Sequence, residues 1–179
     1  LWGINGASEL LQIDGFDIIS GLVQDPMHVL LEGVVLNELS LILFRFIQVQ
    51  SLFSLKWLNT AISSFKYSYL HSSCKPEPID KIHIDGPGTI KQTAAAMLTL
   101  VHILPIIIGH KIPDEDEHWF NTLRLLQIVI LCTSTYCSEE TPVTLKNLIA
   151  EYLFTFANWV QHVSRCDNFA ERSLNIIDF

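Results

Sequence analysis

The stretch Phe16-Asp-Ile-Ile-Ser-Gly-Leu-Val-Gln-Asp-Pro-Met-His-Val-Leu-Leu-Glu32 decides the fold expected for the first part of the chain. Its first half is apolar and favours an extended backbone, and it stops at the turn-forming pair Asp25-Pro26. Aspartate is a favoured N-cap residue and proline is favoured at the first helical position. The stretch therefore predicts a strand over Phe16–Val23 that turns sharply into a helix beginning at Pro26.

The segment from Pro26 to about Gln48 carries apolar residues at helical spacing along its whole length. They recur every three or four positions, which places them on one wide face of a helix. They are Met27, Leu30, Leu31, Val34, Val35, Leu39, Ile42, Leu43, Phe46 and Ile47. Gly33 inside this run costs roughly 1 kcal/mol relative to alanine, so it indicates close packing or the close approach of another segment.

Three polar residues at the start of this helix, Asp25, His28 and Glu32, share one edge of it. Asp25 can cap the helix through the N–H of Met27 or His28, or it can bind a divalent cation, and its two oxygens allow both. His28 and Glu32 can form a simple pair on a solvated face, or they can support metal-dependent phosphodiester chemistry at Asp25. Both interpretations stay open for each residue.

The block Asp25-Pro26-Met27-His28 resembles the Asp-Pro-Met-His block of the cut-and-paste DNA transposases of the CACTA (EnSpm) type. Weaker similarities extend the resemblance over roughly residues 1 to 135. They lie in Trp2–Gly6, Phe65–Leu70, Leu104–Gly109 and the acidic run before His118-Trp119.

The resemblance implies a ribonuclease H-like core that holds Mg²⁺ or Mn²⁺ through three acids, with a mostly helical insertion before the third. Asp25 would be the second metal-binding acid, and His28 would be a signature residue beside it or a structural one. The first acid is expected upstream of Leu1. Glu171 lies near the distance expected for the third acid, but its neighbours Asn168-Phe169-Ala170 and Arg172 depart from the Arg-Phe-Glu-Ala-Lys-His pattern of the family.

The activity that the resemblance implies is metal-dependent DNA strand cleavage and transfer by the intact parent protein in the nucleus. With one of three acids, this chain is expected to be inactive alone. Two alternatives come from other classes. One is a helical protein-interaction module without catalysis, and the other is an unrelated metal-dependent hydrolase that uses Asp25, His28 and Glu32.

The charge of the chain argues against its being the main DNA-holding surface. The net charge is −8, and neither lysine nor arginine precedes Arg45, whereas phosphate binding needs clustered basic residues. DNA is therefore expected to contact regions outside this chain.

The apolar content predicts that part of the surface is covered. Apolar residues make up 49% of the chain and the mean hydropathy is +0.33. The expected cover is the rest of a longer chain or another copy, as in a homo-oligomer. No window is a convincing membrane span, no secretory signal is visible, and the four scattered cysteines suit reduced thiols in a protein that is not secreted.

The rest of the sequence predicts a mainly α protein, in which one strand-to-helix unit of the ribonuclease H-like core is followed by an all-helical insertion. Helices are expected over 51–65, 89–109, 114–135 and 141–165, with a long connection over 66–88. Pro105 is expected to kink or end the second of these, and acids from Asp114 to Glu117 to form the first turn of the third. The domains expected are 1–50 as part of the core, 51–165 as the helical insertion, and 166–179 as a divergent tail.

Overall fold

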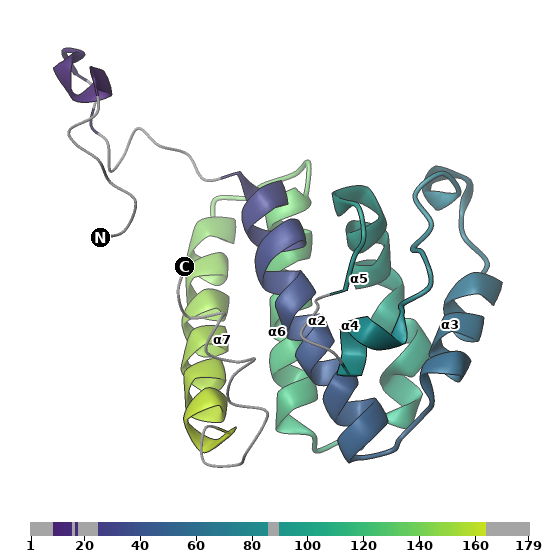
Figure 1. The fold of residues 1–179 in the computed structure, drawn as a ribbon. Coiled ribbons are helices and arrows are strands. Elements are labelled where there is room, and N and C mark those ends of the chain that lie inside the picture. The colour runs from purple at the N-terminus through teal and green to yellow at the C-terminus, as the bar shows by residue number, and fades with distance from the viewer. Residues whose placement is uncertain (1–8, 16, 18–24, 86–89, 164–179) are drawn as a thin grey trace.

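The computed structural model describes residues 9–15, 17, 25–85 and 90–163. Within these ranges the chain forms helices and connecting loops without a strand, so the prediction of a mainly helical fold is confirmed (Figure 1). The predicted strand over Phe16–Val23 lies outside the described residues except for Asp17. The block Trp2–Gly6, Glu171 and the tail over 166–179 also lie outside them.

One long helix runs through the middle of the fold. It is continuous from a π-helical segment, Met27–Val34, through α2 (Val35–Phe44) to a second π-helical segment, Arg45–Val49. A Cβ atom on Gly33 would lie 3.1 Å from the carbonyl oxygen of His28. The close approach that Gly33 indicates therefore comes from the backbone of its own helix five residues earlier, not from another segment.

The other helices are arranged around this one (Figure 1). They are α3 (Leu55–Ser64), α4 (Lys81–Asp85), α5 (Ala94–Ile108), α6 (Glu117–Thr133) and α7 (Thr141–Val163), with short 3₁₀ turns at Glu9–Gln12, Tyr69–His71 and Gly109–Lys111. Helix α2 packs against α4 and α6, α5 packs against α3 and α6, and α7 packs against α6 at the edge of the array.

Three helices begin later than their predicted starts at 51, 89 and 114. The reason is local capping, because a polar side chain just before each helix accepts a backbone N–H of the first turn. Ser54 accepts from Trp57, Thr93 from Ala96 and Asp116 from Trp119, at 3.2, 3.3 and 2.9 Å.

The connection over 66–88 also differs from expectation. Helix α4 forms inside this connection, where Ile79 and Ile84 are buried at 1% and 0% exposure and hold it to the core. Helix α5 continues one turn past Pro105, because Ile107 and Ile108 beyond it are buried in the same core. Gly109 follows directly as its C-cap, as predicted.

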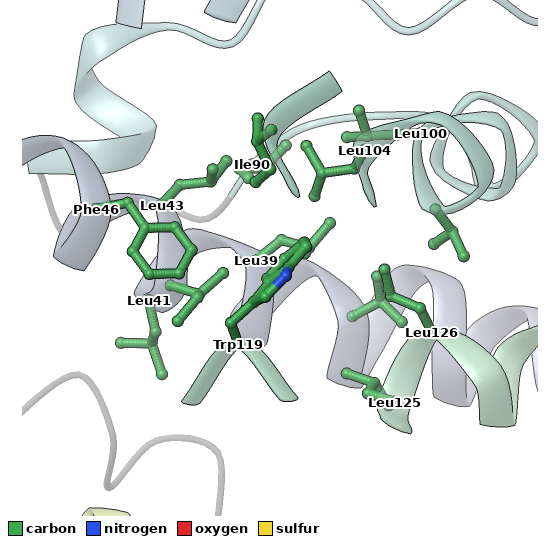
Figure 2. Packing of buried hydrophobic residues seen from close by; sticks show 14 of the residues in the cluster. Leu39, Leu41, Leu43, Phe46, Ile90, Leu100, Leu104, Trp119, Leu125 and Leu126 are labelled. Atoms are coloured by element: carbon green, nitrogen blue, oxygen red, sulfur yellow. The ribbon is translucent and has the colours of Figure 1, made fainter. Parts of the chain in front are cut away.

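The core lies where α2, α5 and α6 meet (Figure 2). Leu39, Leu43, Leu100 and Leu104 are completely buried there. Two stretches, Met27–Val49 and Ala94–Lys111, are long and apolar enough to cross a membrane by length and composition, and 44% and 56% of their most apolar windows are buried inside the fold. The buried apolar side chains of both stretches are part of the core.

Candidate functional site

Asp25 caps the long central helix. Its Oδ1 atom accepts the N–H of Met27 at 2.9 Å, and its carbonyl oxygen accepts the N–H of Val29 at 3.0 Å. Both bonds satisfy donors that the start of a helix otherwise leaves unpaired. The predicted capping role is confirmed, and Pro26 occupies the first helical position.

His28 joins Asp25 and Glu32 along one edge of the helix. Its Nδ1 atom lies 2.7 Å from Glu32 Oε2, and its Nε2 atom lies 3.6 Å from Asp25 Oδ2. The hydrogen bond with Glu32 is the main cause that raises the pKa of His28 above 6.5, and the negative charges of Asp25 and Glu32 add to it. The predicted pairing of His28 with Glu32 is therefore present, on a solvated face.

The Asp25 carboxylate fits one position of a metal site. Its side chain is 53% exposed, with Oδ1 used by the cap and Oδ2 facing the ring of His28. Mg²⁺ takes one or two carboxylates and keeps several waters, so a single exposed oxygen is an acceptable ligand. The described part of the chain contains no group of three or more His, Cys, Asp or Glu side chains placed to hold a metal.

The sequence predicted that the acids from Asp114 to Glu117 form the first turn of a helix. In the structure they do not. Asp116 precedes α6 and caps it, and Glu117 alone lies inside the helix. Asp114 and Glu115 are exposed in the loop before it. The helix dipole therefore acts on one of these acids within the helix and on a second at its cap.

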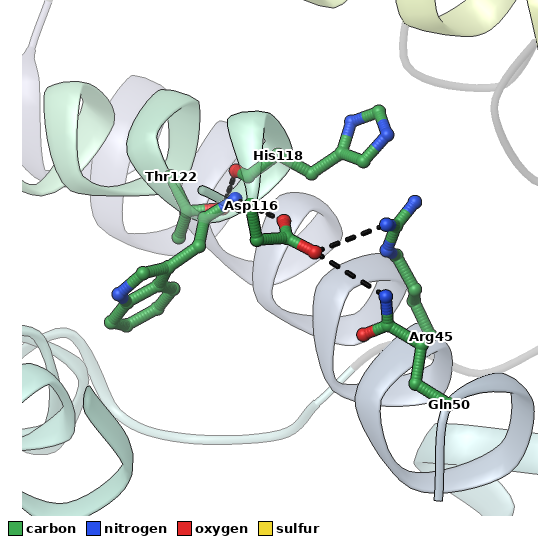
Figure 3. A network of polar contacts seen from close by, with 6 residues as sticks. Arg45, Gln50, Asp116, His118 and Thr122 are labelled. Carbon is green, nitrogen blue, oxygen red and sulfur yellow. Dashed lines mark hydrogen bonds and ion pairs between the residues drawn. The ribbon is translucent and has the colours of Figure 1, made fainter. Parts of the chain in front are cut away.

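Asp116 also holds two side chains from the end of the central helix (Figure 3). Its Oδ2 atom accepts hydrogen bonds from Arg45 at 3.1 Å and from Gln50 at 3.3 Å. Burial alone would raise the pKa of Asp116, but the N–H of Trp119, the Gln50 amide and the Arg45 charge outweigh burial and lower that pKa. The cluster fixes the start of α6 against the central helix, although Arg45 Nε and Gln50 Oε1 are buried without a partner.

Glu38 is a buried acid that the sequence pattern did not single out. It is 1% exposed in α2, and its carboxyl oxygens lie 3.4 Å from the Thr122 hydroxyl in α6 and 3.4 Å from the Tyr152 hydroxyl in α7. Burial raises its pKa to about 7, and the two hydroxyls lower it only in part. A signal did exist, because Glu38 lies between Val35, Leu39 and Ile42 on the apolar face of the predicted helix.

A groove of about 1010 Å³ lies between α6 and α7. Phe120 and Phe154 line it with exposed aromatic rings, and Arg45, His118, Arg124 and Trp159 complete much of its wall. Both arginines are paired with acids, Arg45 with Asp116 and Arg124 with Glu151. The groove therefore offers aromatic surface with little uncompensated positive charge.

Comparison of the chain with protein-family models, with curated proteins and with solved structures finds no match.

Proposed function

We propose that this chain is part of a transposase-like protein whose intact form cleaves and transfers DNA strands with Mg²⁺ or Mn²⁺. The observation that carries the proposal is Asp25 at the exposed start of a long helix, within the block Asp25-Pro26-Met27-His28. Its capped, solvent-facing carboxylate suits one ligand of a divalent-metal site. The remaining acids would come from other parts of the protein.

Each residue at this edge has a distinct part in the proposal. Asp25 supplies a ligand oxygen through Oδ2 while Oδ1 keeps the helix start in place. His28 sits beside that oxygen and is held by Glu32 at 2.7 Å, so it positions the edge without being a ligand of Mg²⁺. Divalent cations bound by such acids activate the attacking oxygen and stabilise the leaving oxygen in strand cleavage.

The DNA in this proposal is held elsewhere. A net charge of −8 gives this chain little attraction for phosphates. Helices α3 to α7 would serve as the insertion that packs beside the catalytic core. The protein would act in the nucleus, where its substrate is.

The test is Mn²⁺-dependent nicking and strand transfer of labelled DNA by the intact parent protein. Asp25→Asn keeps the helix cap but weakens the metal ligand, and we expect at least a hundredfold loss of activity. Glu115→Gln, which removes an exposed carboxylate in the loop before α6, is the control and should retain the activity. Full activity in Asp25→Asn would overturn the proposal. Metal binding by this chain can also be measured by calorimetry. Binding that His28→Gln abolishes would favour the unrelated hydrolase instead.

The second candidate function is a protein-interaction module, and the groove between α6 and α7 favours it. Phe154 is 72% exposed and Phe120 is 47% exposed, which is unusual for large aromatic side chains. Sedimentation of the purified chain tests for self-association through this face. Under this candidate, Phe154→Ser weakens association and Asp25→Ala leaves it unchanged.

A further inference from the structure

Three helices distant in the sequence meet at the single carboxyl group of Glu38. Thr122 reaches it from α6 and Tyr152 reaches it from α7, each at 3.4 Å. The carboxyl is closed off from water, since Glu38 is 1% exposed. An acid in this position must be satisfied by its neighbours, because water cannot solvate it.

Counting protons around Glu38 favours a neutral acid. The Thr122 hydroxyl has one proton. Its oxygen lies 3.0 Å from the carbonyl oxygen of His118 (Figure 3) and 3.4 Å from the Glu38 carboxyl. If that proton goes to His118, the Thr122 oxygen is left as an acceptor. A protonated Glu38 then donates to Thr122 and accepts from Tyr152, so every hydroxyl proton has an acceptor. An ionised Glu38 would have to share the Thr122 proton with His118 and would keep Tyr152 as its other donor.

No positive charge compensates an ionised Glu38 within the described residues. Tyr152 is the titratable group that touches it, and burial followed by the proximity of Glu38 raises the pKa of that phenol, which keeps it neutral. The charged and titratable groups of the elements around Glu38 are not among the causes that shift its pKa, which are burial, Thr122 and Tyr152. They are His28 and Glu32 at the helix start, Arg45 at its end, Lys81 and His83 in α4, His102 in α5, Glu117, His118 and Arg124 in α6, and Lys146 and Glu151 in α7.

Few side chains of helix α7 are fully buried, and Tyr152 is one of them. Across its described side chains, Tyr152, Phe156 and Trp159 are the buried ones, whereas Leu153 and Phe154 are 55% and 72% exposed. Tyr152 is therefore both one of three apolar anchors and the partner of Glu38. Its backbone carbonyl also accepts the amide of Asn121 from α6 at 3.3 Å, so a shift of Tyr152 disturbs the α6 contact as well.

We propose that the docking of α7 on α2 and α6 is proton-linked through Glu38, being tightest with a neutral carboxyl and weaker once it ionises. The pKa of Glu38 is about 7 in the docked state and 4.5 in the unperturbed acid, and this difference gives the direction in which docking depends on pH. Because the docked state binds the proton more tightly, docking is strongest below pH 4.5. It weakens as the pH rises through about 7. Between about pH 6 and about pH 8 the docking equilibrium should weaken about tenfold.

The experiment is hydrogen–deuterium exchange of the α7 backbone amides across that pH range, corrected for the intrinsic exchange rate. In the native sequence, α7 protection should fall about tenfold while α5 protection stays constant. In Glu38→Gln, whose amide donates to Thr122 and accepts from Tyr152 as the neutral acid does, α7 protection should not change with pH. Glu115→Gln, which removes an exposed carboxylate, should behave as the native sequence does.

Two outcomes overturn the proposal. One is α7 protection in the native sequence that does not change with pH, and the other is Glu38→Gln that keeps the full native pH dependence. If Glu38→Gln fails to fold, the carboxyl of Glu38 is titrated directly in the native chain by carbon NMR. A midpoint near 7 supports the proposal and a midpoint near 4.5 sinks it.

Discussion

At the scale of single residues, the start of the central helix combines two properties of one carboxylate. Asp25 uses Oδ1 to accept the N–H of Met27 and leaves Oδ2 beside His28. Its contribution to folding can therefore be separated from any role in binding metal. Substitutions that keep a side-chain acceptor preserve the first property alone.

Replacing Asp25 by alanine should destabilise the protein by about 1 kcal/mol, because the N–H of Met27 loses its acceptor. Asp25→Ser keeps a capping oxygen and should cost only a few tenths of a kcal/mol by the same reasoning. Urea denaturation followed by circular dichroism measures both. Equal stability of the two variants would show that the cap contributes nothing.

His28 should titrate above 6.5, because Glu32 accepts a hydrogen bond from its protonated ring. Because the pKa of His28 is raised in the folded protein, this pair stabilises the fold fully below pH 6.5. That stabilisation is lost as the pH rises through the raised pKa. Glu32→Gln should bring the pKa back toward 6.5 in a proton NMR titration. Glu115→Gln is the control and should leave the titration of His28 unchanged, and an unaltered midpoint in Glu32→Gln would contradict the assignment.

At the scale of elements, capping side chains set where the helices begin. Asp116 is the clearest case, because it accepts the N–H of Trp119 and also holds Arg45 and Gln50. One side chain thus fixes both the start of α6 and its position against the end of the central helix. The half-buried Arg45 and Gln50 would lose hydrogen-bond partners if that carboxylate were removed.

Asp116→Ala should therefore destabilise the protein by about 2–3 kcal/mol, from the lost cap and from the lost hydrogen bonds of two half-buried side chains. Asp116→Asn keeps an oxygen for the cap and should fall between the native protein and the alanine variant. The matched control is Asp114→Ala in the exposed loop before α6, which should stay within about 0.5 kcal/mol. The comparison fails if both alanine variants unfold at the same urea concentration.

At the scale of the whole molecule, the fold is a set of helices that close over the apolar face of the central helix. Leu39 lies at the centre of that face with 0% exposure. By contrast, Ile106 in α5 is equally apolar but 68% exposed. Comparing substitutions at Leu39 and Ile106 therefore separates the effect of burial from the effect of side-chain type.

Leu39→Ala should cost about 3 kcal/mol, because it removes buried methyl groups and leaves a cavity that helices on several sides cannot fill. Ile106→Ala should cost less than about 1 kcal/mol, since its side chain is already largely in water. Thermal and urea unfolding of both variants provide the measurement. A similar loss in both would mean that the packing around Leu39 is not the source of stability.

Much of this arrangement could be predicted from local patterns. The central helix, its start at Pro26, its cap at Asp25 and the pairing of His28 with Glu32 all follow from residues within four positions of one another. The starts of α3, α5 and α6 were placed too early, because several polar residues precede each helix and the sequence does not show which one turns its side chain inward. The strand over Phe16–Val23 stays a prediction.

The sequence by itself determined that the central helix and the four other long helices form, because apolar spacing acts between neighbours along the chain. The tertiary structure alone decided that Glu38 meets Thr122 and Tyr152, and that Asp116 meets Arg45 and Gln50. These partners are distant in sequence, and a contact between them depends on how the helices pack together. The apolar face of the helix marks Glu38 as a candidate for burial, but its chemistry is set by the side chains that packing brings to it.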